Sequence, residues 1–334
     1  MRHPATASVR PVYIHGGAVA GCAAAIAARQ AGAHTIVYEK SLFPRHKVCG
    51  EFLSAGVETL FAELGLWESF VRLAPARMTK LALHFPCKSF HFDLPRSCWG
   101  VSRFTLDVWL KDCALGAGAE WRQELAPAEQ APTVLAHGRK HQAPRGHRLF
   151  GFKAHHTGPP TETIELHFFD GCYVGVNPVE DGIVNVCGLG PEEMFRDYHF
   201  RYDEVCSRSE TLRRRRSELK RSMDWLSAGP LLYRSSFSRG EQPGVYPAGD
   251  ALGFVDPFTG TGMFNALLSG SLAGKAAANG EPVEHYLDDC RRLLHRPFWV
   301  SSLFRRALAS GIAERAVGWM PGSLLFHLTR AQLG

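Results

Sequence analysis

Short β-prone runs alternate with a helical run at the start of the chain. Val12–Ile14 and Thr35–Tyr38 are rich in β-branched and aromatic residues, which predicts two short buried strands. Between them, Cys22–Gln30 is rich in alanine and predicts a helix, with Gly32 placed to cap its C-terminus. The order strand, glycine-rich turn, helix, strand is that of a βαβ unit, whose two strands are parallel.

The pattern changes twice further along the chain. Apolar residues at helical spacing predict helices over Ser54–Phe70 and Thr105–Gly116. After residue 149 come short β-prone runs that predict an antiparallel sheet, namely Thr163–Phe169, Gly171–Val176 and Gly182–Gly188. The rest of the chain is mostly helical, over 191–227, Phe264–Ala278 and 291–334, with one strand at Val245-Tyr246. We therefore expect an α/β fold with a Rossmann-like domain, an inserted antiparallel β-sheet domain and a helical C-terminal tail.

Composition is that of an ordinary globular protein and excludes several classes. Of the 334 residues, 45% are hydrophobic and 21% are charged, which argues against a disordered or collagen-like chain. The net charge of +6 is too small for a nucleic-acid-binding extreme, so we expect no nucleic-acid partner. Nine cysteines form no CxxC pair, which supports neither a disulfide framework nor a zinc site. We expect no metal and a reducing, cytoplasmic location.

Two stretches bear on membranes. The first ten residues lack the apolar stretch of a signal peptide, and no apolar run approaches the roughly 18–20 residues of a spanning helix. In the C-terminal tail, an apolar helix face stands opposite Arg305 and Arg306; it comprises Val300, Leu303, Phe304, Ala307 and Leu308. Such a face either packs on a domain or lies on a membrane surface, which leaves peripheral membrane contact as an alternative.

The first glycine-rich turn follows the first strand. Gly16 permits a tight turn, the small Ala18 lets the backbone approach a pyrophosphate, and Gly21 lets the helix pack closely on the strand. The N–H groups at the N-terminus of the helix would then face the phosphates, and Glu39 would accept hydrogen bonds from an adenosine ribose. This order and spacing predict a dinucleotide-binding unit, although the middle glycine of the usual pattern is Ala18.

A second glycine-rich loop lies near the other end of the chain. Residues Gly249–Met263 contain four glycines, follow a short strand and lead into a helix. A glycine-rich loop at a helix N-terminus forms a platform for anions, and Asp250 is well placed to bind a hydroxylated chain. Two nucleotide-type loops in one chain are harder to explain by chance than one.

Two further segments carry charge. Pro44–Glu51 is basic, then small, then acidic, and its plainest interpretation is a solvated loop before a helix. Arg213–Arg216 is a run of four arginines in a helical segment, which is typical of a solvated helix face.

Taken together, the chain resembles flavoprotein oxidoreductases of the geranylgeranyl reductase type, within the wider class that has the p-hydroxybenzoate hydroxylase fold. The matching stretches run in the family's order: Gly16–Gly21 with Glu39, Pro44–Glu51, Ser102–Asp107 and Gly249–Met263. Lys47–Glu51 is similar to the family's Cys-Gly-Glu motif. The Gly249–Met263 loop is similar to its second FAD loop and is the most specific match.

The resemblance implies FAD as the cofactor and a role for each matching position. The pyrophosphate would be held by Gly16, Gly17, Ala18, Val19, Ala20 and Gly21. Glu39 would bind the ribose with Lys40 beside it, Arg103 would neutralise the phosphates, and Asp250 would bind the ribityl or pyrophosphate region. Cys49 and Gly50 would lie near the flavin or ribityl chain. The isoalloxazine would receive backbone N–H groups from Gly260, Thr261, Gly262 and Met263.

The same resemblance divides the chain into domains. The FAD-binding domain would comprise residues 9–80, 101–148 and 236–290. The substrate domain would comprise the strands of 81–100 and residues 149–235, and C-terminal helices would follow over 291–334.

Two departures from the family pattern fall in the middle of the chain. His137-Gly138 stands where the family has Asp-Gly, and the stretch from Glu120 to Val134 is short. Relatives usually thread extra strands there, so we expect a loss of strands that buttress the FAD, which leaves the cofactor affinity open.

Three functions stay open. The leading hypothesis is an FAD-dependent oxidoreductase that reduces a C=C bond of a hydrophobic isoprenoid- or polyketide-like substrate, with Cys49 as the only catalytic candidate. Cys49 is equally well interpreted as a small packing residue. The alternatives are a flavin-dependent monooxygenase and a degenerate, non-catalytic binder of FAD or lipid. A halogenase is disfavoured because no Trp-x-Trp-x-Ile-Pro stretch occurs. The electron donor is open among NAD(P)H, a ferredoxin and a quinol.

Overall fold

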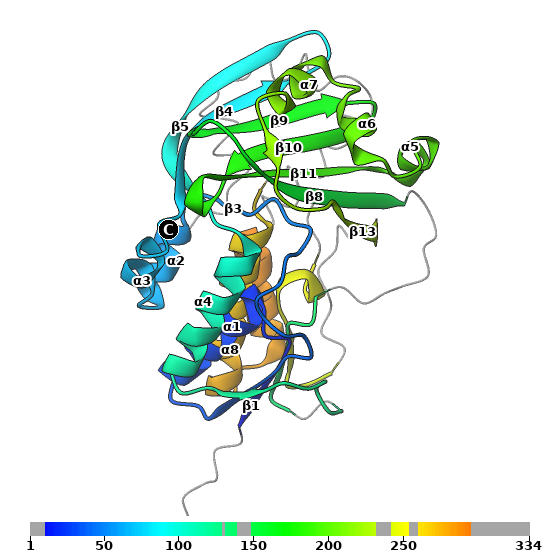
Figure 1. The fold of residues 1–334 in the computed structure, drawn as a ribbon. Coiled ribbons are helices and arrows are strands. Elements are labelled where there is room, and N and C mark those ends of the chain that lie inside the picture. The colour runs from blue at the N-terminus through cyan, green and yellow to red at the C-terminus, as the bar shows by residue number, and fades with distance from the viewer. Residues whose placement is uncertain (1–10, 129–130, 139–147, 232–241, 254–259, 295–334) are drawn as a thin grey trace, which may run out of the picture.

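A computed structural model describes residues 11–128, 131–138, 148–231, 242–253 and 260–294. These residues form a five-stranded and a nine-stranded sheet, which lie at opposite ends of the molecule in Figure 1. A layer of long helices accompanies the smaller sheet, and shorter helices accompany the larger one.

The smaller sheet is parallel throughout and has the order β14-β7-β1-β2-β6. Its strands are β1 (Val12–His15), β2 (Thr35–Tyr38), β6 (Glu120–Arg122), β7 (Thr133–Leu135) and β14 (Val245–Pro247). The chain turns to opposite sides of β1 to form β2 and β7, so the switch point of the strand order lies at the carboxyl end of β1. Ligands of open α/β sheets bind at such points.

Three long helices form a layer beside this sheet, namely α1 (Val19–Gln30), α4 (Arg103–Gly116) and α8 (Gly262–Asn279). Figure 1 shows them side by side, and α1 packs on both of the others. The approach of α8 to α1 is very close, because a Cβ at Gly270 or Gly274 would lie about 2 Å from the carbonyl oxygen of Ala20 or Ala24. This contact explains why both helices are rich in glycine and alanine.

The larger sheet has the order β12-β8-β11-β10-β9-β4-β5-β3, with β13 paired to β8. Its strands are β3 (Phe52–Leu53), β4 (Ala76–His84), β5 (Ser89–Gly100), β8 (Leu149–Thr157), β9 (Thr163–Phe169), β10 (Cys172–Pro178), β11 (Ile183–Pro191), β12 (Lys220–Arg221) and β13 (Leu226–Leu231). All pairings are antiparallel except that between β4 and β9, so the sheet is mixed. No tight turn joins these two strands, which come from distant parts of the chain, and their direction is therefore not restricted to antiparallel.

Short helices make up the rest of the described chain. The helical pattern over 191–227 forms α5 (Glu192–Asp197), α6 (Tyr202–Cys206) and α7 (Glu210–Arg216), which bury an apolar face against Val174 and Val186 of the larger sheet. The expected single helix over Ser54–Phe70 is instead two, α2 (Val57–Glu63) and α3 (Trp67–Val71). Gly65 between them has a φ of +69°, a conformation that ends a helix. Single 3₁₀ turns occur at η1 (Glu180–Gly182) and η2 (Gly249–Ala251).

The expected fold class is confirmed as an α/β fold with a Rossmann-like parallel sheet and a second, mixed sheet. The helical tail is described only as far as residue 294, so the face with Arg305 and Arg306 lies outside the described residues. Within the described part of the chain, no helix has the length and hydropathy to cross a membrane. The domain boundaries remain predictions.

Candidate functional site

The first glycine-rich turn is held by contacts that admit no side chain. Gly16 has a φ of +105°, and a Cβ there would lie 2.4 Å from the carbonyl oxygen of Ala136. A Cβ at Gly21 would lie only 1.7 Å from the carbonyl oxygen of Gly16. The buried carboxylate of Glu39 accepts hydrogen bonds from the backbone N–H groups of Gly17 (2.9 Å) and Ser41 (2.7 Å). The sequence pattern therefore forms a rigid turn, and Glu39 fixes it.

The second glycine-rich loop meets the first at the N-terminus of α1. A Cβ at Gly249 would lie 3.0 Å from the Cβ of Ala20, and the N–H of Gly249 donates to Ser269 Oγ at 2.9 Å. Neither of the N-cap residues, Ala18 of α1 and Thr261 of α8, caps its helix through its own side chain. Ala20 and Ala24 of α1 lie against Gly270 and Gly274 of α8, so the two helices are parallel and α8 begins about two turns beyond the N-terminus of α1. The positive ends of both helix dipoles therefore point the same way. Residues 254–259 of this loop lie outside the described residues.

Asn265 in the first turns of α8 is a candidate that the sequence patterns did not single out. Its side chain is buried, yet neither Oδ1 nor Nδ2 has a hydrogen-bond partner among the described residues. A buried amide without partners costs about 1–3 kcal/mol, so such groups usually face a ligand, ion or water. Its position one helical turn before Ser269, which binds Gly249, places it at the same loop.

A charged cluster lies at the start of α4. Asp107, with a fully buried side chain, accepts from Arg103 at 2.8 and 2.9 Å and from Lys47 at 2.7 Å. Burial alone would raise the pKa of Asp107, but the two cations hold this pKa below its usual value. The Cys49 side chain lies beside the Arg103 guanidinium and, after Asp107, contributes to raising the pKa of Arg103. With two cations and one anion, the cluster carries one excess positive charge, which suits an anionic ligand.

A second cluster fixes the Cys-Gly-Glu segment to the larger sheet. Glu51, with a fully buried side chain, accepts from Lys153 Nζ and the backbone N–H of Arg103 (2.7 Å) at Oε1, and it bonds His155 Nε2 (2.6 Å) at Oε2. Burial opposes ionisation, but His155 and Lys153 outweigh it and lower the pKa of Glu51. Asn185 Nδ2 donates to the carbonyl oxygens of Cys49 and Gly50 at 3.1 and 2.9 Å. The segment is therefore held on both sides, not a loose solvated loop.

The remaining predicted positions fall into two groups. Lys40, Gly50, Asp250 and Gly262 are exposed, and a Cβ at Gly50 or Gly262 would meet no atom within 4 Å. The side chains of Val19, Ala20, Thr261 and Met263 are buried in the protein, so they could serve a ligand only through their backbone. Gly17 lies against the indole of Trp121, and no local sequence pattern predicts this contact. Between β6 and β7, the described residues form no strand, as the short spacing indicates.

Comparison with solved structures places this arrangement among known folds. The flavin-dependent brominase Bmp2 matches with a TM-score of 0.77 and 19% identity, over 95% of this chain and 92% of that one. A flavoprotein/dehydrogenase from Cytophaga hutchinsonii matches with a TM-score of 0.73 and 17% identity, over 92% and 87%. A geranylgeranyl bacteriochlorophyll reductase-like protein from Thermoplasma acidophilum matches with a TM-score of 0.74 and 17% identity, over 94% and 92%.

The chain has the fold of these flavoproteins. No family model and no curated protein matches the sequence. Because the fold is shared by a brominase, a dehydrogenase and a reductase-like protein, it identifies neither the reaction nor the substrate. The expected resemblance is thus supported at the level of the fold, and not for the geranylgeranyl reductase type in particular.

Proposed function

We propose that the chain binds FAD and reduces a C=C bond of a hydrophobic isoprenoid- or polyketide-like substrate. The observation that carries the proposal is a pair of parallel helices, α1 and α8, whose N-termini point the same way beside a cluster with excess positive charge. FAD carries two negative phosphates and a ring system that accepts hydrogen bonds, so this site meets its needs.

The residues present fit the cofactor. The N-terminal N–H groups of α1 would bind the pyrophosphate, and the excess charge of Lys47 and Arg103 over Asp107 would offset the phosphate charge. The open space at Gly50 and Gly262 would admit a ring system close to the backbone. The unpartnered amide of Asn265 supplies both a donor and an acceptor for it.

We assign the substrate wall to the face of the larger sheet that carries His155 and Asn185. Leu166 of β9 lies opposite Gly175 of β10, and Asn177, two residues further along β10, lies opposite Asn185. Leu166 and Phe168 therefore project from the same face of the sheet as Asn185. They pack with Leu81, Leu83, Phe90, Phe92 and Tyr173. The polar groups that hold Cys49 and the apolar strip thus share one face, which suits a substrate with a long apolar chain.

Bound FAD supplies the hydride chemistry, and this chain's residues position the reactants. The Glu51 and Asn185 contacts hold the Cys49–Gly50 backbone in place, and the apolar strip excludes water from the substrate. Cys49 Sγ, beside the Arg103 guanidinium, is the group to which we assign proton delivery to the substrate carbon.

An absorption spectrum before and after addition of FAD tests cofactor binding. We expect the bands of a bound flavin, and a protein that neither holds nor takes up FAD would be the degenerate relative instead. Asn265→Leu should weaken FAD binding about tenfold, while the flavin-free protein becomes no less stable because an unpaired buried amide is lost. Asn279→Leu, at the exposed end of the same helix, is the matched control.

Anaerobic reoxidation of the reduced flavin tests the reaction. A polyprenyl substrate should reoxidise it without oxygen, and Cys49→Ala should abolish this reaction while FAD stays bound. Product formation that requires one O2 per turnover would identify a monooxygenase instead. Retained turnover in Cys49→Ala would reduce Cys49 to a packing residue. NAD(P)H, a reduced ferredoxin and a quinol are the donors to compare.

A further inference from the structure

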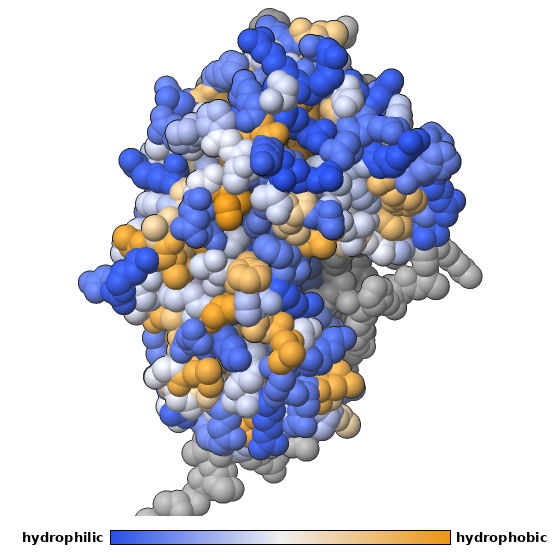
Figure 2. Space-filling view, viewed as in Figure 1, coloured by the Kyte–Doolittle hydropathy of each residue, from blue (hydrophilic) through white to orange (hydrophobic). Residues whose placement is uncertain are grey.

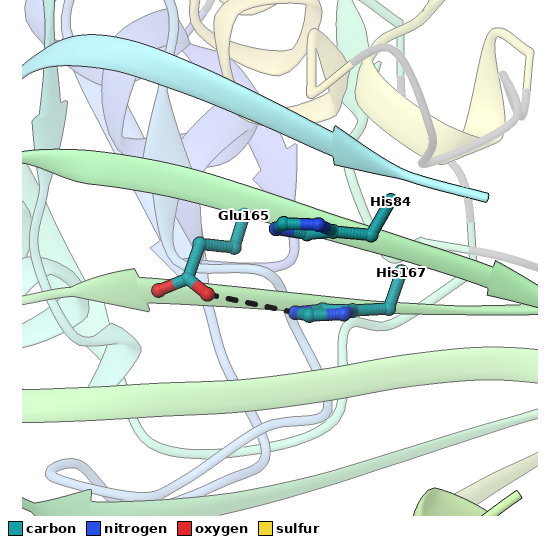
Figure 3. Close-up of side chains that lie close together, drawn as sticks. All are labelled: His84, Glu165 and His167. Carbon is teal, nitrogen blue, oxygen red and sulfur yellow. Dashed lines mark ion pairs between the residues drawn. The ribbon is translucent and has the colours of Figure 1, made fainter. Parts of the chain in front are cut away.

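Three potential metal ligands gather on β4 and β9, at the only parallel pairing of the larger sheet within the described chain. His84 is the last residue of β4 and lies directly opposite His167 of β9, and Glu165 lies opposite Ala82. Residues opposite each other, and residues two apart on a strand, project from the same face. Figure 3 shows the two imidazoles stacked with the carboxylate beside them.

This cluster is separate from the proposed flavin site. Glu165 lies opposite Val176, Val176 lies opposite Val186, and Val186 lies opposite Ala154. These residues therefore project from one face of the sheet, which is the face that the helices α5–α7 cover. Lys153 and His155, which hold Glu51, alternate with Ala154 and project from the opposite face. Whatever binds at His84, Glu165 and His167 therefore lies across the sheet from the residues that hold Glu51.

The donor atoms are already selected by their neighbours. His84 Nδ1 is hydrogen-bonded to Ser89 Oγ at 2.8 Å, and His167 Nδ1 to Thr211 Oγ1 of α7 at 2.9 Å. This leaves Nε2 of each ring for another partner, and hydrogen bonds at the other ring nitrogen are typical of metal-binding histidines. One ligand atom from each of the three residues lies within 4.8 Å of the other two.

An independent observation points to a missing ligand. The side chain of His167 is fully buried, yet its Nε2 has no hydrogen-bond partner in the described chain and lies 3.6 Å from Glu165 Oε2. The His84 ring is stacked on it, with centroids 4.5 Å apart and an angle of 17° between the planes. Two imidazoles therefore approach one carboxylate oxygen without any group that satisfies all three.

The contacts of Glu165 leave one of its carboxylate oxygens open to such a group. Arg215 bonds Oε1 at 2.7 Å and leaves Oε2 for a second partner.

We propose that His84, Glu165 and His167 bind a divalent transition metal, with zinc as the ion of choice. Two imidazole nitrogens and one carboxylate oxygen are a donor set that Zn²⁺ uses widely, and water can complete the coordination at the partly exposed His84. The metal clamps β4 to β9, two strands that no tight turn connects. It also ties them to α7 through Thr211 and Arg215.

The four-arginine run takes part in this environment. Its expected interpretation as a solvated helix face is wrong for Arg215 and Arg216, whose side chains are 11% and 17% exposed. Arg215 turns inward to Glu165, whereas Arg213 stays exposed and pairs with Glu210 of its own helix. Figure 2 shows mainly hydrophilic residues over the end of the molecule where α7 lies.

The test is a zinc chloride titration of untagged, chelator-treated protein by calorimetry, followed by X-ray absorption at the zinc edge. We expect one zinc per chain with only nitrogen and oxygen ligands, at about 2.0–2.2 Å. His84→Ala and His167→Gln should each remove this binding. Thr211→Val, which leaves all three ligands, should weaken it about 10–100-fold because it frees the His167 ring. His91→Ala is the matched control, since His91 lies beside His84 outside the cluster.

Several results would overturn the proposal. Absence of saturable binding by the wild-type protein would do so, as would unchanged binding in both histidine variants. Sulfur in the first coordination shell, at about 2.3 Å, would assign the zinc to some of the nine cysteines instead. If His167→Gln does not fold, His84→Ala decides the matter, because His84 lies at a strand end and is partly exposed.

Discussion

Two buried glutamates on opposite faces of one sheet have similar neighbours but differ in whether both of their carboxylate oxygens have hydrogen-bond partners. Glu51 bonds Lys153, His155 and the N–H of Arg103, so both of its oxygens are engaged. Glu165 bonds Arg215 through one oxygen, and its other oxygen faces a histidine nitrogen 3.6 Å away. A saturated cluster only holds the structure together, whereas an unsaturated one keeps the capacity to bind something else.

The largest expected effect comes from breaking the saturated cluster. Glu51→Gln leaves the fully buried Lys153 without its anion, which should lower the free energy of unfolding by about 3–5 kcal/mol. Urea denaturation measures it. Glu162→Gln is the control, because Glu162 pairs with Lys80 on the exposed surface and should matter little. A loss equally small in both variants would contradict the comparison.

The double variant Glu51→Gln with Lys153→Met sharpens the same point. It removes both charges of the pair, and buried pairs are often replaced by apolar groups at little cost. Part of the lost stability should therefore return in the double variant. A double variant less stable than Glu51→Gln alone would show that Lys153 contributes mainly through other contacts.

Zinc should distinguish the two glutamates by its effect on stability. At a free concentration 100 times its Kd, a ligand specific for the folded state adds about 2.7 kcal/mol. Thermal unfolding with and without zinc chloride should show this gain in the wild-type protein and a much smaller gain in Glu165→Gln. Glu51→Gln, although less stable, should keep the full response; an equal loss of response in both variants would mean that the faces are coupled.

A smaller effect is expected from Arg215, which shares Glu165 with the proposed metal. Arg215→Gln removes a competing positive charge, so zinc should bind about fivefold more tightly, or about 1 kcal/mol. Arg213→Gln, on the exposed side of the same helix, should leave the affinity unchanged. Weaker zinc binding in Arg215→Gln would show that Arg215 instead positions the carboxylate.

An effect that depends on pH concerns His156, whose neighbour His155 faces the opposite side of the sheet. Burial, aided by Arg216, lowers the pKa of the buried His156 to about 4. Because an unfolded histidine titrates near 6.5, the unfolded chain binds more protons between these values, and stability falls as the pH drops from about 6.5 to 4. One such group gives at most about 1.4 kcal/mol per pH unit. His156→Gln should flatten Tm against pH in this range; an unchanged slope would assign it to other groups.

The sequence predicts best what depends on local spacing. The bounds of β9 agree with the predicted Thr163–Phe169, and the helix after the second glycine loop begins two residues before its predicted start. Glycine turns can be predicted from the sequence because the steric limits on the backbone act within a few residues. The break in the Ser54–Phe70 pattern could have been predicted from Gly65, which lies inside it.

What the sequence could not predict depends on pairing between distant strands. His84 and His167 are 83 positions apart and meet only because β4 and β9 pair in one register. A search for cysteine pairs and short ligand spacings does not detect them. Similarly, Glu51 is one acidic residue in a polar segment until β8 brings Lys153 and His155 to it. The roles assigned to the predicted FAD-binding residues remain predictions.

The close packing of α1 on α8 has a consequence for the timing of synthesis. α1 is complete at residue 30, but the groove that Gly270 and Gly274 provide for it is complete only when residue 279 has been made. At about 5–20 residues per second, the ribosome needs more than about ten seconds for that interval. The strands of the larger sheet, finished by residue 231, have their partners sooner. The side of α1 that faces α8 is therefore among the last surfaces to be buried, and it stays uncovered by α8 during most of translation.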